Sequence, residues 1–95
     1  TASKSALSTY MKYAALELAG KGIRCNAVQP GRINTPLISN RLLSEEDVTK
    51  DIEQYPMKRY GKPEEVAHAI IYLLSDASAW VTGTNLVIDG GRSLK

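Results

Sequence analysis

NAVQPGRINT, residues 26–35, is the stretch that decides the fold. The alternating apolar pattern that begins at Ile23 and runs into it predicts a strand packed between layers. Pro30 has no N–H for a ladder and Gly31 can take a positive φ, so the backbone is expected to turn sharply there. Open α/β sheets bind their ligands just past such strand ends, although an ordinary turn is the plainer interpretation.

Composition narrows the class of protein. The chain of 95 residues is long enough for one small domain, yet short for an α/β sheet covered on both faces. A net charge of +2 argues against nucleic-acid and membrane partners, and no apolar run approaches the ~20 residues of a membrane span. The single cysteine, Cys25, is expected in the core. One cysteine cannot form a disulfide framework, so a reducing, cytoplasmic location is the default expectation. Because Thr1 already lies inside a predicted element, we expect a piece of a longer protein.

Residues 2–19 are predicted to form a helix that Gly20-Lys21-Gly22 ends. Its polar side chains share one narrow wedge, and apolar side chains cover most of the remaining circumference. Such a helix should be buried on two sides, one of them against its own sheet. For the other side we give equal weight to a partner subunit and to the chain's own core.

Lys4 falls in the first turn of that helix, where the helix dipole disfavours a cation. A solvated lysine is the ordinary interpretation of such a residue. The alternative is functional, because an ammonium group at this end can donate hydrogen bonds to ligand hydroxyls or lower the pKa of a neighbouring phenol.

Local signals also place elements in the second half of the chain. Pro36 can start a helix, and Ser44 with Asp47 predicts the capped start of a second short helix. Pro63 and the two glutamates after it predict a further helix that runs to Ser75. We expect the inner stripe of this helix to comprise Val66, Ala67, Ile70, Ile71 and Leu74.

His68 and Tyr72 share the outer face of the same helix. His68 is the only histidine and lacks the partners of a catalytic or metal site, so no metal site is predicted. Trp80 is expected to act as an anchor, and residues 83–88 to form the last strand. The Asp89-Gly90-Gly91 turn should end that strand with no helix after it, which disfavours a phosphate loop.

The predicted order is helix, strand, helical lid, helix, strand. It indicates an α/β fold, the C-terminal half of a Rossmann-type doubly wound parallel sheet. Two strands alone leave a bare edge and bare apolar faces, so the rest of the domain or a partner must cover them.

Four stretches resemble the classical short-chain dehydrogenase/reductase family. Thr1-Ala2-Ser3-Lys4 looks like the end of its Tyr-x-x-x-Lys motif, cut just after the tyrosine, and residues 22–35 resemble its Asn-x-(Val/Ile)-x-Pro-Gly-x-x-x-Thr strand and loop. Residues 59–67 and 81–91 are similar to its two closing signatures. The resemblance covers essentially the whole chain in the expected order, as the C-terminal part of a single NAD(P)-binding domain.

The resemblance implies roles for individual residues. Lys4 would be catalytic, binding the nicotinamide ribose hydroxyls of NAD or NADP and keeping a catalytic tyrosine acidic. Pro30 and Gly31 would let the cofactor approach the backbone, and Ile33 would fix the carboxamide through its main-chain groups. Thr35 would place its hydroxyl near the carboxamide and pyrophosphate.

The segment at about residues 36–60 would be the substrate lid. Its apolar wall is expected from Leu37, Ile38, Leu42 and Tyr55, and a surface helical hairpin packed on itself is an equal alternative. The implied function is hydride transfer between NAD(P)(H) and a secondary alcohol or ketone, of 3-oxoacyl or sugar/polyol type. The alternative is a noncatalytic nucleotide-binding or assembly module of the same fold.

The resemblance also implies partners. The glycine-rich phosphate loop, the serine and the tyrosine would precede Thr1, so the 95-residue chain alone is predicted to be inactive. A homodimer or homotetramer is expected through the helix at residues 2–19 and through residues 63–75 with the last strand. A tyrosine immediately before Thr1 would support an enzyme, and phenylalanine or alanine there would count against it.

Overall fold

The computed structural model describes residues 2–34 and 44–95. These residues form two compact units, which we describe one at a time. Unit 1 comprises Thr1–Val28 and Ala69–Leu86, and unit 2 comprises Gln29–His68 and Val87–Lys95.

Helix α1 spans Ala2–Ala19, as predicted. It ends where the Ile23 N–H donates to the Leu18 carbonyl and the Gly22 N–H donates to the Ala19 carbonyl. Gly22 has a φ of 75°, the left-handed conformation that such a helix end favours and that glycine adopts without strain. The predicted glycine stop is therefore confirmed.

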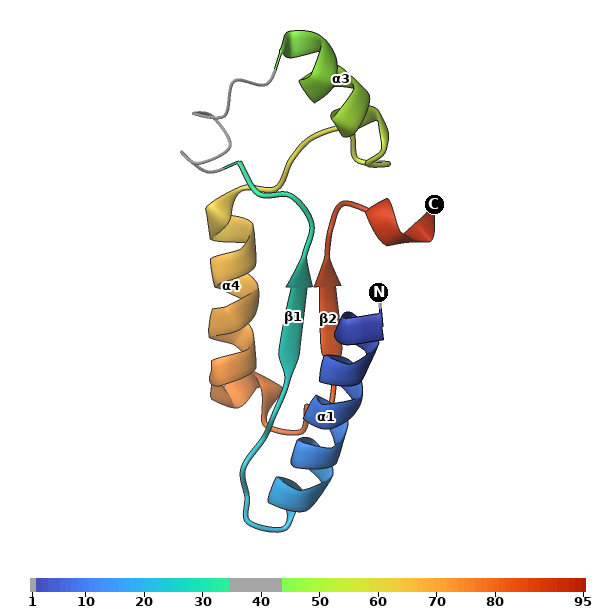
Figure 1. Ribbon diagram of the computed structural model, residues 1–95. Coiled ribbons are helices and arrows are strands. Elements are labelled where there is room, and N and C mark those ends of the chain that lie inside the picture. The colour runs from blue at the N-terminus through green and yellow to red at the C-terminus, as the bar shows by residue number, and fades with distance from the viewer. Residues whose placement is uncertain (1, 35–43) are drawn as a thin grey trace. The chain divides into compact units, whose positions relative to one another are not determined.

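Strands β1 (Ala27–Pro30) and β2 (Asn85–Ile88) pair in a two-stranded sheet. The Ala27 N–H donates to the Thr84 carbonyl, and the Gly31 N–H donates to the Ile88 carbonyl. The donor and the acceptor are the same number of residues apart in both hydrogen bonds, which makes the strand pair parallel. Figure 1 shows the two arrows pointing the same way. The predicted α/β fold with parallel strands is confirmed.

The beginnings of both strands were predicted too early. Residues 23–26 are not strand, because side chains take the place of the ladder there: the Cys25 N–H donates to Thr82 Oγ1, and the Asn26 side chain binds the backbone at Val81 and Thr84. On the facing segment Gly83 has a φ of 75°, which extended strand does not allow. Cys25 is half-buried rather than deep in a core.

Two helices lie in the connection between the strands. Helix α3 spans Glu45–Glu53, and its N-cap Ser44 accepts a hydrogen bond from the Asp47 N–H at 3.1 Å. Helix α4 spans Pro63–Leu74, with Pro63 at its first position. Both predicted starts are confirmed, whereas the helix predicted from Pro36 lies outside the described residues.

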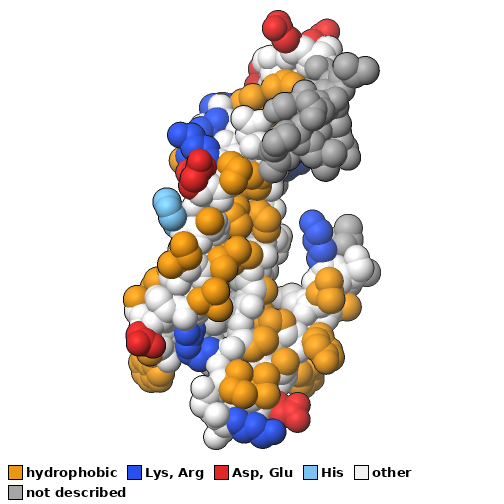
Figure 2. All heavy atoms as spheres, turned by 90° about the vertical axis from the view of Figure 1, so that its left-hand side faces the viewer, with side chains coloured by type: hydrophobic (Ala, Val, Ile, Leu, Met, Phe, Trp, Pro, Cys, Tyr) orange, Lys and Arg blue, Asp and Glu red, His pale blue; other side chains and the backbone are white. Residues whose placement is uncertain are grey.

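The inner stripe predicted for α4 is largely wrong. Leu73 is its buried residue, while Ile71 and Leu74 are 62% and 79% exposed. The cause is that α4 carries apolar residues around most of its circumference, so helical periodicity does not single out one face. Figure 2, seen from the α4 side, shows hydrophobic side chains gathered along this helix.

The turn after α4 is built around Ser78 rather than Trp80. Ser78 is 1% exposed in the short 3-10 helix η1 (Asp76–Ser78), and its hydroxyl bonds the Leu73 and Ser75 carbonyls. Trp80 is fully exposed, so its predicted role as an anchor is wrong. Tryptophan is commonly buried, but no tertiary neighbour in the described chain covers this ring.

Arg24 joins the end of α4 to the loop that leads to β2, within unit 1. Its guanidinium donates to the carbonyls of Leu73 (2.8 Å), Ser75 (3.3 Å) and Val81 (3.4 Å) and to Ser78 Oγ (2.9 Å). A cation beside the last carbonyls of a helix satisfies groups that have no partner inside the helix and complements its dipole.

In unit 1 the buried side of α1 is formed by Met11 and Ala15, one turn apart. Ala15 lies against Gly83, and Figure 1 shows α1 and the last turns of α4 on opposite sides of the strands. Leu7, Tyr10, Tyr13 and Leu16 of α1 are each at least 70% exposed. Within the described residues, no helix has both the length and the apolar character needed to cross a membrane.

Candidate functional site

The loop that follows β1 is held by hydrogen bonds from the N–H groups of Gly31, Arg32 and Asn34 and to the carbonyl of Arg32. The Arg32 N–H donates to the Tyr55 hydroxyl at 3.0 Å, and the Arg32 carbonyl accepts from the Gly61 N–H at 3.0 Å. The Asn34 N–H donates to the Gly61 carbonyl at 2.9 Å, which completes a parallel bridge between Ile33 and Gly61. Within the described residues, the main-chain N–H and C=O of Ile33 have no hydrogen-bond partner.

Gly31 is required for space rather than for an unusual φ. The predicted positive φ is wrong, because Gly31 is not among the glycines with this conformation. A Cβ on Gly31 would lie 3.0 Å from Asp89 Cβ and 3.0 Å from Tyr55 Cε1. These two side chains occupy one side of the loop, so a ligand has to approach Gly31 from another side.

Arg32 is bound through its side chain as well as its backbone. Arg32 Nη1 lies 2.7 Å from Asp51 Oδ2, and the Tyr60 hydroxyl donates to the same carboxylate oxygen at 2.6 Å. The rings of Tyr55 and Tyr60 meet edge to face with their centroids 6.1 Å apart. Burial and the hydrogen bond to Asp51 raise the pKa of Tyr60, so its hydroxyl stays a proton donor at neutral pH.

A second ion pair fixes the start of α4. Arg59 donates to both carboxylate oxygens of Glu65, at 2.6 and 2.8 Å, and the Lys62 N–H donates to Glu65 Oε1 at 2.8 Å. The hydrogen bonds from Arg59, followed by the one from Lys62, lower the pKa of Glu65 to about 2. The bidentate geometry sets the path of the chain between Arg59 and the helix.

Asp89 ends β2 and caps the turn behind it. Its two carboxylate oxygens accept from the N–H groups of Gly91 and Ser93, each at 3.0 Å. Burial opposes the ionised form, but the hydrogen bonds from Ser93 and Gly91 outweigh it and lower the pKa of Asp89. A short 3-10 helix, η2 (Arg92–Leu94), follows, so the expectation of no helix after this turn is wrong.

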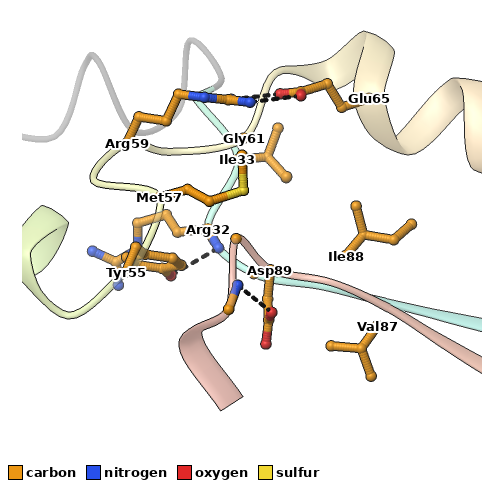
Figure 3. Close-up of a pocket in the computed structure, with 13 residues that line it drawn as sticks. Arg32, Ile33, Tyr55, Met57, Arg59, Gly61, Glu65, Val87, Ile88 and Asp89 are labelled. Atoms are coloured by element: carbon orange, nitrogen blue, oxygen red, sulfur yellow. Dashed lines mark hydrogen bonds and ion pairs between the residues drawn. The ribbon is translucent and has the colours of Figure 1, made fainter. Parts of the chain in front are cut away.

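A cavity of about 250 Å³ lies at the carboxyl ends of both strands. It is lined by residues of the loop at 31–33, of the segment at 55–61 and of the turn at 87–91, together with Glu65, all within unit 2. Figure 3 shows Tyr55 beside the Arg32 backbone, with the Arg59–Glu65 pair at one edge of the view. The position agrees with the rule that α/β sheets place ligands at strand carboxyl ends.

The predicted site residues are distributed over both units. Lys4 is exposed in the first turn of α1, in unit 1, whereas Gly31 and Ile33 are half-buried in unit 2. Their convergence on one cofactor therefore stays a prediction. Thr35, Leu37, Ile38 and Leu42 lie outside the described residues.

Tyr55 is 7% exposed, with its ring against Gly31 and its hydroxyl on the loop backbone. Its predicted place in a substrate wall is not tested by these contacts. They show in addition that the residue supports the loop, which the sequence did not reveal.

Arg32, Asp51 and Tyr60 were missed because they are far apart in the chain and only the folded loop brings them together. No spacing rule connects a helix carboxylate to a loop phenol. Among the described residues, there is no group of three or more His, Cys, Asp or Glu side chains suited to hold a metal ion.

Comparisons with known proteins cover almost the whole chain. A family model described as Enoyl-(Acyl carrier protein) reductase matches residues 1–93. Cyclohexanol dehydrogenase of Acinetobacter sp. (strain SE19) is 44% identical over 94 residues, which are 99% of this chain and 36% of that protein. The 3-oxoacyl-[acyl-carrier-protein] reductase of Thermotoga maritima is 47% identical over 90 residues, 95% of this chain and 36% of that protein.

Solved structures show the same similarity. A 4-hydroxyisoleucine dehydrogenase complexed with NADH superimposes with a TM-score of 0.89 at 33% identity, covering 99% of this chain and 39% of that one. The chain thus spans little more than a third of the length of the relatives it matches.

Proposed function

Since this chain belongs to the classical short-chain dehydrogenase/reductase family, we propose that the whole protein transfers hydride between NAD or NADP and a secondary alcohol or its ketone. The relatives are named as dehydrogenases and reductases, and one solved neighbour contains NADH. The alternative, a noncatalytic nucleotide-binding or assembly module, shares the fold and differs in the test below.

The available main chain of Ile33 is the observation that carries this proposal. The loop uses the N–H groups of Gly31, Arg32 and Asn34 for its own bonds and leaves the N–H and C=O of Ile33 without partners among the described residues. One donor next to one acceptor complements a primary carboxamide, which has an oxygen and an NH₂ group. The residues therefore fit a nicotinamide carboxamide.

Within this mechanism the chain supplies position and charge. The cofactor, when bound, accepts or donates the hydride. Ile33 would fix the carboxamide and so choose the face of the ring presented to the substrate, while Thr35 would hold the phosphate side. Lys4 would bind the ribose hydroxyls, and its positive charge would favour the ionised form of a catalytic tyrosine supplied by the preceding segment.

For the substrate, we infer a secondary alcohol or ketone of 3-oxoacyl or sugar/polyol type. The names of similar proteins support this range, because they include a 3-oxoacyl-[acyl-carrier-protein] reductase and a glucose 1-dehydrogenase of Bacillus subtilis, 44% identical over 93 residues. Leu37, Ile38 and Leu42 would form the apolar lid over such a substrate, with Tyr55 behind the loop.

We further propose that the remaining part of the domain and a second copy of the protein cover the exposed apolar surfaces. Exposed tyrosine and leucine side chains along α1 and exposed isoleucine and leucine side chains on α4 support an assembly through α1 and through α4 with β2. Homodimers and homotetramers both satisfy this arrangement.

The test uses the whole protein and a matched pair of lysine variants. Lys4→Met should lower kcat/KM at least about 100-fold with a panel of secondary alcohols and ketones. The reason is that the catalytic tyrosine loses the positive charge that favours its ionised form. Lys12→Met removes another exposed lysine from the same helix and should leave kcat/KM unchanged.

Two outcomes would contradict the proposal. Tight binding of NADH or NADPH without turnover of any substrate would favour the noncatalytic module. Failure of the unmodified protein to bind either cofactor would reject hydride transfer and nucleotide binding, and would favour an assembly module.

A further inference from the structure

Four side chains of unit 2 form a closed ring of contacts around Arg32, and we call this ring the Arg32 clamp: Arg32, Asp51, Tyr55 and Tyr60. The Tyr55 hydroxyl accepts from the Arg32 N–H, and the Tyr55 ring meets the Tyr60 ring edge to face. The Tyr60 hydroxyl donates to Asp51, which pairs with the Arg32 guanidinium. The ring therefore holds both the backbone and the side chain of one residue.

The clamp acts next to the available main-chain groups of Ile33. Arg32 precedes Ile33, and Gly61, which follows Tyr60 in sequence, bonds the Arg32 carbonyl and the Asn34 N–H on either side of it. A Cβ on Gly61 would lie 2.8 Å from Ile33 Cδ1, so the Ile33 side chain packs against the Gly61 backbone. The peptide groups that flank Ile33 are thus held from both directions.

We propose that Tyr55 is a positioning residue for the cofactor, and that it acts through the Arg32 clamp by fixing the direction of the Ile33 N–H and C=O. This inference rests on the proposed function. A preorganised donor and acceptor bind better than mobile ones, because the entropy of ordering the loop is lost before the ligand arrives.

The clamp fits this role better than a purely structural one. The Tyr55 hydroxyl binds a loop N–H next to the proposed carboxamide site, whereas a phenylalanine ring would fill the same space against Gly31 without that bond. Among the described residues, the side-chain hydrogen bonds and ring contacts of Asp51 and Tyr60 stay within the clamp.

The test measures two ligands on the whole protein. NADH or NADPH, whichever binds more tightly, is compared with the matching ADP-ribose, which lacks the nicotinamide. Tyr55→Phe should weaken binding of the reduced cofactor about 3- to 10-fold, as expected for one lost hydrogen bond, and should leave ADP-ribose within about 2-fold. The kcat should fall as well, because the nicotinamide ring of the cofactor is less well oriented.

Two further variants sharpen the result. Asp51→Asn keeps an oxygen for Tyr60 but loses the charge that Arg32 binds, so it should show a smaller loss confined to the reduced cofactor. Tyr72→Phe removes a hydroxyl from an exposed ring on α4 and should change neither affinity.

Equal weakening of both ligands, or of neither, would overturn the positioning role. If Tyr55→Phe does not fold, the same comparison with Asp51→Asn decides. Absence of NADH and NADPH binding in the unmodified protein would instead count against the proposed function. Failure of the positioning role and failure of the proposed function are therefore distinguishable.

Discussion

The two units keep their loops in place by different chemistry. In unit 1, Arg24 and Asn26 bind backbone carbonyls and one backbone N–H, and the acceptors of Arg24 are carbonyls and a serine hydroxyl. In unit 2, two arginines pair with carboxylates, Arg32 with Asp51 and Arg59 with Glu65.

This difference determines how each unit responds to pH. Backbone carbonyls and amide side chains do not titrate in the range where proteins fold, so the hydrogen bonds that hold the loops of unit 1 do not depend on pH. Carboxylates lose their charge on protonation, so the ion pairs that hold the loops of unit 2 weaken in acid. Acid is therefore expected to weaken the ion pairs around the proposed cofactor loop in unit 2 and to leave the Arg24 hydrogen bonds in unit 1 unchanged.

Arg24→Met should give the largest effect on stability. It removes a guanidinium with four acceptors and leaves partly buried carbonyls without donors, so the free energy of unfolding should fall by about 3 kcal/mol. Urea unfolding of the whole protein at pH 7 and pH 5 measures this loss, which should be the same at both. Arg24→Lys should recover little of it, because one ammonium does not reach all the acceptors. A loss that depended strongly on pH would break the contrast between the units.

Gly31→Ala should have the next largest effect. The added Cβ meets Asp89 and Tyr55 at 3.0 Å, so the loop has to shift, at a cost of about 2 kcal/mol. Gly20→Ala is the matched control, because Gly20 has open space around it and no positive φ, and it should not destabilise the protein. Equal stability of the two variants, measured by urea unfolding, would mean that Gly31 is not confined.

Glu65→Gln should have the smallest effect, one that depends on pH. The pKa of Glu65 is lowered in the folded protein, so its contribution is complete above about 4.5 and disappears as pH falls toward about 2. At pH 7 the variant should lose on the order of one to two degrees in melting temperature, because the pair is exposed. The difference from the unmodified protein should shrink below pH 4.5. The matched control is Glu64→Gln, which removes an exposed carboxylate from the same turn without breaking an ion pair between described residues. A constant difference across this range would contradict the assigned ion pair.

The sequence was a good guide wherever one residue decides the local backbone. Ser44 capped α3, Pro63 opened α4 and Gly22 closed α1, because cap and turn chemistry depends on neighbours along the chain. The order of elements then followed from their lengths and connections. For the candidate site, the sequence singled out the loop after β1, where the Ile33 N–H and C=O have no hydrogen-bond partner among the residues that the structure describes.

The predictions were wrong where the burial or conformation of a residue depends on residues far away in the sequence. Trp80 and the stripe on α4 depend on which surfaces other parts of the fold cover, and apolar periodicity carries no such information. Gly31 was singled out for the wrong reason, because Tyr55 and Asp89 approach it from other segments. The Arg32 clamp was invisible for the same cause, since its members meet only after folding.

The two hydrogen bonds on either side of Ile33 also tie Arg32 and Asn34, where the chain leaves the strand framework, to Gly61, where it returns. A segment closed at its base can vary in length and content at little cost, because the entropy of closing a loop grows only slowly with the number of residues. The chain between Asn34 and Gly61 can therefore gain or lose residues at little cost to the elements on either side of it. A replacement segment without Asp51, Tyr55 and Tyr60 would keep the two hydrogen bonds at its base but lose the contacts that hold Arg32.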